Sequence, residues 1–220
     1  MLWALAAATL ILICPQPGLC QTAPAKEPRL EVFVQGGAAL YTDTKGSKVE
    51  FFTGTNTTFS FSLRKSFATS ARTSAGLRVA LSSRNKVEVN YSYASGRLTN
   101  SLSTSTIPAP VISVTWMRTD SVHASYVRVL SHKEKSQVYI LGGMGVTVFS
   151  LTFRKEAHPS GTLGAGLDLR LNKHFSIRLE QRMTITGAPQ RTFFIDSPTF
   201  DVPGKTFTFT PSVGLVWRFR

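Results

Sequence analysis

The sequence predicts an all-β protein: an eight-stranded antiparallel transmembrane up-and-down β-barrel, preceded by a signal peptide. Apolar and polar residues alternate with period two from Leu30 to the C-terminus, in segments rich in Val, Thr, Tyr and Phe. Helix signals are scarce, and no run of about 18 apolar residues follows residue 25, so any membrane span must consist of strands. The connections between alternating segments are short and long in turn, as in membrane barrels.

Residues 1–20 have the features of a cleaved export signal. Residues 1–25 contain no charged side chain, and the apolar run from Leu2 to Ile13 is too short to span a bilayer as a helix. Both cysteines, Cys14 and Cys20, lie in this segment, so the mature chain would carry none and would not depend on disulfide bonds. The expected organisation is a signal peptide at 1–20, a short periplasmic segment at 21–28 and the barrel at 29–220.

The first three strands alternate clearly. Residues 30–41 form the first strand, and strands around 73–81 and 87–94 are joined by a tight turn at 82–86. Their apolar faces consist of Leu30, Val32, Val34, Leu40, Leu77, Val79, Leu81, Val87, Val89, Tyr91 and Tyr93. Upstream, a segment containing Phe59 either extends the second strand or forms a small additional hairpin.

The fourth and fifth strands are less regular. The fourth begins as early as Val111 and ends near Leu130, and it places Arg128 on the same face as Tyr126. The fifth, residues 137–149, carries apolar side chains on both faces. The alternation therefore does not decide which side of the fourth strand faces outward.

The third hairpin and the last strand are the most regular segments. The hairpin turns at residues 172–174, and Gln181 is the single polar exception on its apolar face. That face consists of Leu163, Ala165, Leu167, Leu169, Leu171, Phe175, Ile177, Leu179, Met183 and Ile185. In the last strand, which runs to Phe219, Pro211 removes one ladder donor and predicts a bulge or local irregularity.

The connections divide into two kinds. Short turns lie near residues 82–86, 131–136 and 172–174, and long loops lie near 42–66, 95–110, 150–161 and 187–205. In outer-membrane barrels the short turns face the periplasm and the long loops face outward. This asymmetry predicts a bacterial outer-membrane location.

The identity of the polar residues favours a membrane barrel over a soluble one, which would place its charges outside. A charge on the lipid face near the midplane would cost ~2–4 kcal/mol. We therefore assign the charged face to the lumen, where the charges must pair. The predicted lumenal charge network is Arg78, Glu88, Asp168, Arg170, Arg178, Glu180 and Arg182. The predicted aromatic girdle and C-terminal assembly signal are Phe175, Phe207, Phe209, Trp217 and Phe219.

Several segments carry a family resemblance: the hairpin from Gly76 to Tyr91, the strand around Gly142, the hairpin from Gly164 to Arg182 and the aromatic end Trp217 to Arg220. In these the chain resembles the OmpA/OmpX-type outer-membrane β-barrel domain family, over most of residues 29–219. The resemblance implies insertion with the help of periplasmic chaperones and the barrel-assembly machinery. Members of such families usually end in an aromatic residue that this machinery reads, whereas here the aromatic Phe219 is penultimate and Arg220 follows it.

The function expected from the sequence is a structural or surface-binding role, with long external loops displayed from a side-chain-filled barrel. The net charge of +13 favours contact with outer-membrane lipids and lipopolysaccharide, and no nucleic-acid partner is expected of an exported chain. The ligand of the loops is not indicated. No cofactor or metal is expected, because the histidines are scattered.

Two alternative functions remain. The first is a narrow solute pore, although eight strands leave an interior that side chains largely fill. The second is a lipid A-modifying outer-membrane hydrolase, indicated by His123 and Ser125, which share one face of a strand. A serine nucleophile needs an adjacent base, but no orienting acid is identifiable by spacing. A structural role for both residues is the expected one.

Overall fold

The computed structural model describes residues 30–45, 49–53, 57–104, 111–133, 135–152, 154–189 and 204–219. The expected signal peptide and the short segment after it lie outside these ranges. No helix among the described residues is long and apolar enough to cross a membrane.

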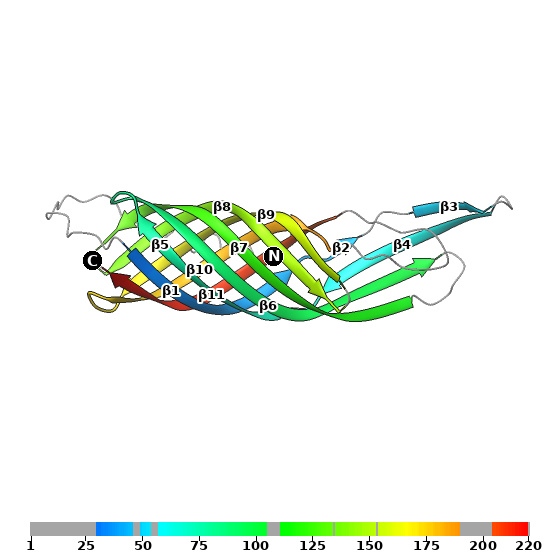
Figure 1. The fold of residues 1–220 in the computed structure, drawn as a ribbon, viewed down its shortest axis with the longest axis horizontal. Coiled ribbons are helices and arrows are strands. Elements are labelled where there is room, and N and C mark those ends of the chain that lie inside the picture. Colours follow the sequence, from blue (N-terminus) through cyan, green and yellow to red (C-terminus); the bar gives the residue numbers. More distant parts are fainter. Residues whose placement is uncertain are drawn as a thin grey trace, which may run out of the picture.

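Eight antiparallel strands close into a barrel, as the sequence predicts (Figure 1). They are β1 (Leu30–Tyr41), β5 (Ser70–Ala80), β6 (Asn85–Thr104), β7 (Val111–His132), β8 (Ser136–Leu151), β9 (Arg154–Arg170), β10 (Phe175–Gly187) and β11 (Lys205–Phe219). From β5 to β11 each strand pairs with the next one along the chain, and β1 pairs with both β5 and β11. The barrel wall therefore has no free edge.

The barrel has its polar side chains inside and its apolar side chains outside. Leu215 on the outward face is 59% exposed, whereas Arg178 on the inward face is fully buried. Exposed apolar residues continue around the wall, including Val34, Leu77, Val89, Ile140, Met144, Leu163 and Leu179. This polarity is the reverse of that in a soluble protein and is the arrangement of a membrane barrel.

The facing of the fourth barrel strand, β7, is now defined. It exposes Val122 and Tyr126 and buries His123 and Val127. Inside the barrel, Val127 packs in a buried apolar cluster with Tyr139 and Leu141 of β8. Because both faces of β7 and β8 carry apolar residues, the contrast on which period two depends is weak here.

Three of the four long loops predicted from the sequence are largely strand. The range 42–66 contains β2 (Thr44–Lys45), β3 (Val49–Thr53) and most of β4 (Thr57–Phe67). The range 95–110 contains the end of β6, and around residue 152 β8 and β9 form a tight hairpin. Apart from the segment around Phe59, the sequence does not indicate these strands, because strands that extend beyond the lipid need no apolar face. Of the loop at 187–205, only its ends are described.

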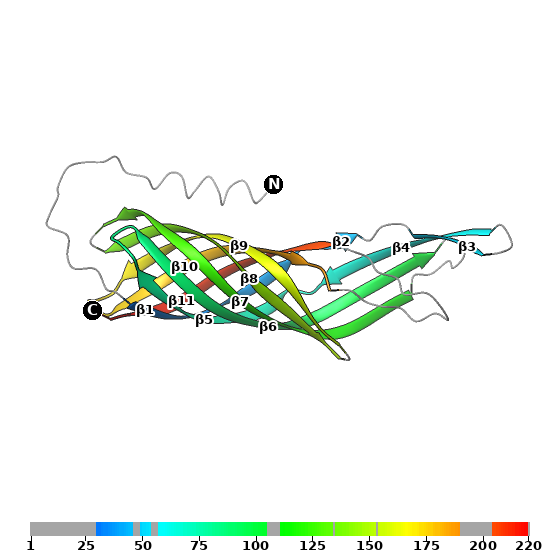
Figure 2. The ribbon, with the colours of Figure 1, turned by 45° about the horizontal axis from the view of Figure 1, so that its top comes forward.

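A sheet projects beyond the barrel at the end opposite the chain termini of the wall (Figures 1 and 2). It consists of β3, β4 and the ends of β6 and β7, and we call it the extension. β4 pairs with β3 on one side and with Leu98–Thr104 of β6 on the other. Both alternatives predicted for the segment around Phe59 therefore occur, because β4 continues the line of β5 and also forms an extra hairpin.

The pairing of the wall strands is irregular in two described places. Between β7 and β8 it shifts between Val129 and Ser131, next to the turn. Pro211 interrupts the ladder between β1 and β11, but Gly37 pairs with Ser212 and Leu40 pairs with Phe209 in one continuous register. Pro211 is thus a local irregularity and not a bulge.

Candidate functional site

Four charged side chains form a ring across the lumen, which we call the lumenal ring: Arg78, Glu88, Asp168 and Arg178. Arg78 Nε donates to Glu88 Oε2 at 3.0 Å between β5 and β6. Arg178 donates to both oxygens of Asp168, at 2.8 and 3.0 Å, between β10 and β9. Across the lumen, Arg78 Nη1 lies 3.7 Å from Asp168 Oδ2 and Arg178 Nη1 lies 3.7 Å from Glu88 Oε2. The charges therefore alternate in sign around the ring.

Two similar hairpins supply this ring from opposite sides of the barrel. In the closed order of strands, β5 is four places from β9, and β6 is four places from β10. In each hairpin the paired arginine and carboxylate are ten residues apart in sequence. The arginine comes first in one hairpin (Arg78, Glu88), and the carboxylate comes first in the other (Asp168, Arg178). The two hairpins are thus related by an approximate two-fold axis along the lumen.

An aromatic ring continues this pseudo-symmetry on each side. The guanidinium of Arg78 lies 4.3 Å from the ring centroid of Tyr139, and that of Arg178 lies 4.6 Å from the centroid of Phe33. These are cation–π distances. Phe33 on β1 and Tyr139 on β8 are again four strands apart. Each arginine is held between a carboxylate and an aromatic face.

Two glycines make room for these aromatic rings. Gly76 pairs with Phe33, and Gly166 pairs with Tyr139. A Cβ on Gly76 would overlap the ring of Phe33, and one on Gly166 would overlap the ring of Tyr139. The absence of a side chain at both positions lets each ring lie over the neighbouring strand.

Further charges attach to the ring on both sides. Lys86 Nζ donates to Glu31 Oε1 at 2.8 Å. Arg182 binds Glu180 at 3.0 Å through Nε, and Tyr139 donates to Glu180 Oε2 at 2.7 Å. Each of these ionic groups has opposite charge close by, as burial requires.

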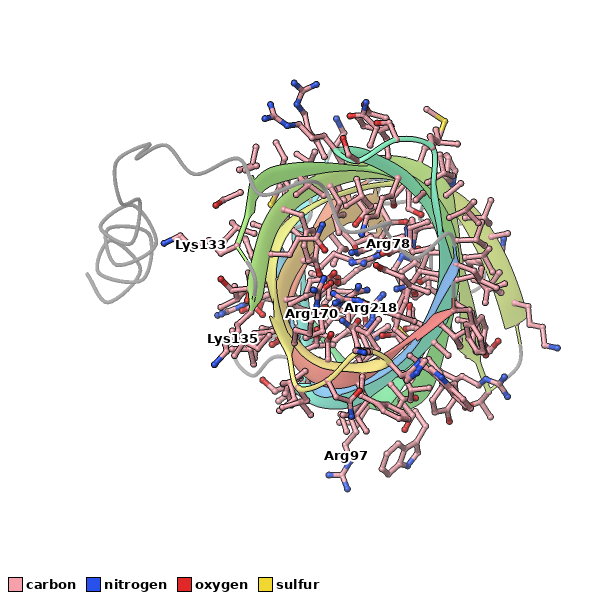
Figure 3. The ribbon with its side chains drawn as sticks, turned by 90° about the vertical axis from the view of Figure 1, so that its left-hand side faces the viewer. Arg78, Arg97, Lys133, Lys135, Arg170 and Arg218 are labelled. Carbon is pink, nitrogen blue, oxygen red and sulfur yellow. The ribbon has the colours of Figure 1, made fainter. Side chains whose placement is uncertain are left out.

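The structure places the predicted network residues as follows. Arg78, Glu88, Asp168, Arg178, Glu180 and Arg182 are all buried in the lumen. Arg170 is only partly buried and lies inside the barrel outline at the end that carries the short turns, which we call the turn end (Figure 3). Arg218 lies inside the same outline, whereas Lys133 and Lys135 lie outside it.

The sequence did not single out several residues of this site. Lys86 lies in the predicted turn at 82–86, and Arg72 lies just before the predicted second strand. Phe33 and Tyr139 are aromatic residues on the polar face, and that parity is the signal that could have identified them. Arg72 is buried and donates to Thr210 Oγ1 at 3.3 Å.

The predicted aromatic girdle lies on the outward face. Phe175, Trp217 and Phe219 are exposed at the turn end, and their rings stack with centroids 5.6 and 5.0 Å apart. Phe207 and Phe209 are partly buried in the half of β11 toward the extension. The aromatic residues are thus found toward both ends of the apolar wall.

His123 and Ser125 both face the lumen and are almost completely buried. His123 Nε2 shares a hydrogen bond with Ser160 Oγ on β9 at 2.9 Å, and Ser125 Oγ has no partner among the described residues. No carboxylate in the described part of the chain is hydrogen-bonded to His123. The pair lacks both the contact and the orienting acid that a serine nucleophile needs.

At the end of the barrel that carries the extension, which we call the loop end, an apolar cluster fills the lumen. Phe67, Leu98, Met117 and Phe149 are buried together, and Tyr41 and Leu151 pack against them. Between this cluster and the lumenal ring lies a cavity of about 10 Å³, which is room for about one water molecule. Seen along the barrel axis, many side chains point into the lumen (Figure 3).

A second charged group lies on the outside where β7 leaves the wall, between the exposed apolar residues Val122 on the wall and Trp116 toward the extension. Arg118 Nε donates to Asp120 Oδ2 at 2.8 Å, and its guanidinium lies 5.0 Å from the centroid of Tyr93. Arg97 lies 4.8 Å from the centroid of Trp116. With Lys155 on β9, whose charge acts on Asp120, these residues form what we call the outer rim.

At the base of the extension, Arg64 donates to Asp43 through Nε at 3.2 Å, and this hydrogen bond lowers the pKa of the Asp43 carboxyl. Within the described ranges, no cluster of three or more His, Cys, Asp or Glu side chains could hold a metal ion.

Comparison with known proteins gives the fold. No family model matches the chain, and no curated protein matches it. Among solved structures, the outer membrane protein OprG from Pseudomonas aeruginosa has a TM-score of 0.54 at 11% identity, covering 88% of this chain and 98% of that chain. Neisserial surface protein A has a TM-score of 0.48 at 14% identity, covering 86% of this chain and 97% of that chain. The fold is that of an outer-membrane β-barrel, in agreement with the location predicted from the sequence.

Proposed function

We propose that the protein is an outer-membrane barrel with a structural and surface-binding role, which displays the extension from a closed wall. The observation that carries this proposal is the unequal length of the strands. β7 pairs with β8 only as far as Met117, opposite Leu151, but its pairing with β6 continues to Val111. The first six residues of β7, 111–116, therefore reach roughly 20 Å beyond the wall.

The orientation follows from the connections. Short turns lie at residues 81–84 and 171–174, at the end of the barrel where β1 begins and β11 ends. In outer-membrane barrels such turns face the periplasm. The extension then projects into the medium, where its polar outer positions, such as Thr99, Ser101 and Ser103 on β6, are solvated.

The closed lumen supports display over conduction. The lumenal ring crosses the full width of the barrel, and the apolar cluster around Phe149 fills its loop end. A pore would need a continuous polar path through both layers. The buried positions of His123 and Ser125 likewise support display over hydrolysis, because lipid contacts the outside of the wall.

The outer rim supports binding of the surface to the phosphates of lipopolysaccharide, which we propose as its first partner. Arg118 is more than half exposed, and Arg97 and Arg118 each stack on an aromatic ring, which fixes the plane of the guanidinium. A guanidinium held in this way keeps N–H edges for bidentate contact with phosphate. The rim lies where the pairing of β7 with β8 ends, at Met117, and we place it at the depth of lipid headgroups.

Site-specific labelling tests the proposed display. The cysteines of the sequence, Cys14 and Cys20, lie in the predicted signal peptide, so Ser103→Cys on the extension and Ser83→Cys in a short turn each add one reactive thiol. On intact cells, a membrane-impermeant maleimide should label only the Ser103→Cys variant, and both should react after lysis. Labelling of Ser83→Cys alone would reverse the orientation, and stable unitary conductance in planar bilayers would replace display by a pore.

A further inference from the structure

We propose that the lumen contains a buried binding site for one small inorganic anion, of the size of a halide, between Arg72 on β5, Gln35 on β1 and Arg182 on β10. The site lies on the loop side of the lumenal ring. It is distinct from the outer rim, and it does not depend on the proposed surface function.

Arg72 carries a buried positive charge that no carboxylate of the described residues balances by an ion pair. Its guanidinium is buried, and it donates to the hydroxyls of Ser92 and Thr210. No carboxylate of the described residues forms an ion pair with it, in contrast to Arg78 and Arg178 in the ring. A buried charge without a partner of opposite sign is strongly unfavourable.

The buried side chains that the structure describes show an excess of the same sign, with seven cations and five carboxylates. The cations are Lys65, Arg72, Arg78, Lys86, Arg178, Arg182 and Arg218, and the carboxylates are Glu31, Glu88, Glu156, Asp168 and Glu180. A bound anion beside Arg72 would reduce this excess.

Two hydrogen-bond donors without a partner lie beside Arg72. Gln35 Nε2 and Arg182 Nη1 are buried without a hydrogen-bond partner, and both side chains line the same cavity as Arg72. The Gln35 amide is oriented by Ser74, whose hydroxyl donates to Gln35 Oε1 at 3.2 Å. The nitrogen is therefore the free end, and a donor is what an anion requires.

The cavity also selects the size of the anion. Its volume of about 10 Å³ admits roughly one particle of the size of water. Phosphate, sulfate and carboxylates are too large for it. Glu180, which also lines the cavity, has its carboxylate engaged by Arg182 and Tyr139, which weakens its repulsion of an anion. A halide such as chloride fits both the size and the donors.

Buried side chains border the site on both sides. The lumenal ring lies on the turn side, and the apolar cluster of Phe67, Leu98, Met117 and Phe149 lies on the loop side. The anion is therefore added during refolding, so that it is present before these layers pack around the site.

The test uses bromide as the probe. The full mature chain is refolded from urea in bromide and crystallised, and anomalous scattering locates the bromine. We expect one peak inside the barrel, within hydrogen-bonding distance of Arg72, Gln35 or Arg182. A wild-type crystal without a peak at these residues overturns the proposal, because the donors then face water alone.

Two variants distinguish the site from general salt effects. Gln35→Glu supplies a covalent carboxylate beside Arg72, so this variant should fold and lose the bromine peak. Its urea midpoint of unfolding should also be the same in bromide as in gluconate at equal ionic strength. Arg84→Met removes an exposed charge in a turn and should keep both the peak and the bromide dependence. Equal bromide dependence of the urea midpoint in the wild type and in Gln35→Glu would reject the site. This test does not need Arg72→Met, which would remove the buried cation itself.

Discussion

Glu88 on β6 and Arg182 on β10 meet across the full width of the barrel, with 2.7 Å between Glu88 Oε1 and Arg182 Nη2. Their strands are four places apart in either direction around the wall. A single ion pair therefore joins opposite sides of the lumen, at the point where Glu88 also receives Arg78.

Removing that carboxylate should weaken the barrel strongly. Glu88→Gln removes one carboxylate that Arg78 and Arg182 share and leaves the buried network with one more uncompensated positive charge, so we expect a loss of about 3–5 kcal/mol in the free energy of unfolding. Urea titration of the refolded protein, followed by the shift in gel mobility between folded and boiled samples, measures this loss. Asp43→Asn, which removes an exposed carboxylate, should cost about 0–1 kcal/mol. Equal effects of the two changes would contradict a central role for Glu88.

The glycines beside the aromatic rings give a prediction about shape. Gly166→Val places a side chain where the ring of Tyr139 lies, and it should displace that ring from Arg78 and destabilise the barrel. Gly161→Val is the matched control, because a Cβ at that position on the same strand meets nothing within 4 Å. The comparison is made with the temperature at which each variant loses its folded gel mobility. If both variants melt together, the packing of Tyr139 against Gly166 is not what stabilises this layer.

The outer rim predicts binding of lipopolysaccharide that depends on charge. Replacing Arg97 and Arg118 by Gln removes two cations at headgroup depth, each contributing about 1 kcal/mol, so the affinity for lipid A should fall roughly 30-fold. Calorimetric titration of lipid A into the protein in detergent gives the affinity, and added salt should narrow the difference. The control replaces Arg84 and Lys173, exposed in the turns at the other end. A similar loss in that control would point to general charge and not to the rim.

The position of His123 and Ser125 predicts the absence of hydrolysis. Cells that produce the protein should contain lipid A with unchanged acyl chains, and Ser125→Ala should be identical to wild type. Mass spectrometry of extracted lipid A checks both. Acyl release that disappears in Ser125→Ala would restore the hydrolase reading and would require a large opening of the barrel.

Sequence reasoning located the barrel strands well where lipid covers one face. In β9 and β10 the outward residues are apolar and the inward ones polar, so parity alone separates Leu179 from Arg178. It located the inward charges for the same reason. In β7 and β8, buried Val127 and Leu141 remove this contrast, and the facing became clear only from the closed structure.

The contacts of the network were beyond the reach of the sequence. Pairing across a hairpin, as between Asp168 and Arg178, follows from the turn, but contact between Glu88 and Arg182 depends on how the barrel closes and how its strands are staggered. Arg72 was missed because it lies at the edge of the predicted strand. Of the extension, the segment around Phe59 was predicted from its alternating apolar residues. The Ser- and Thr-rich end of β6 shows no such alternation and was assigned to a loop, although Thr favours strands.

The network also connects the two ends of the wall. Glu31 belongs to the first strand of the wall and lies near Arg218 of the last, while Lys86 and Arg178 reach the same carboxylate from strands between them. The ion pairs around Glu31 can therefore be complete only when β1 and β11 have paired. Closure of the wall and completion of this buried charge network are one and the same event.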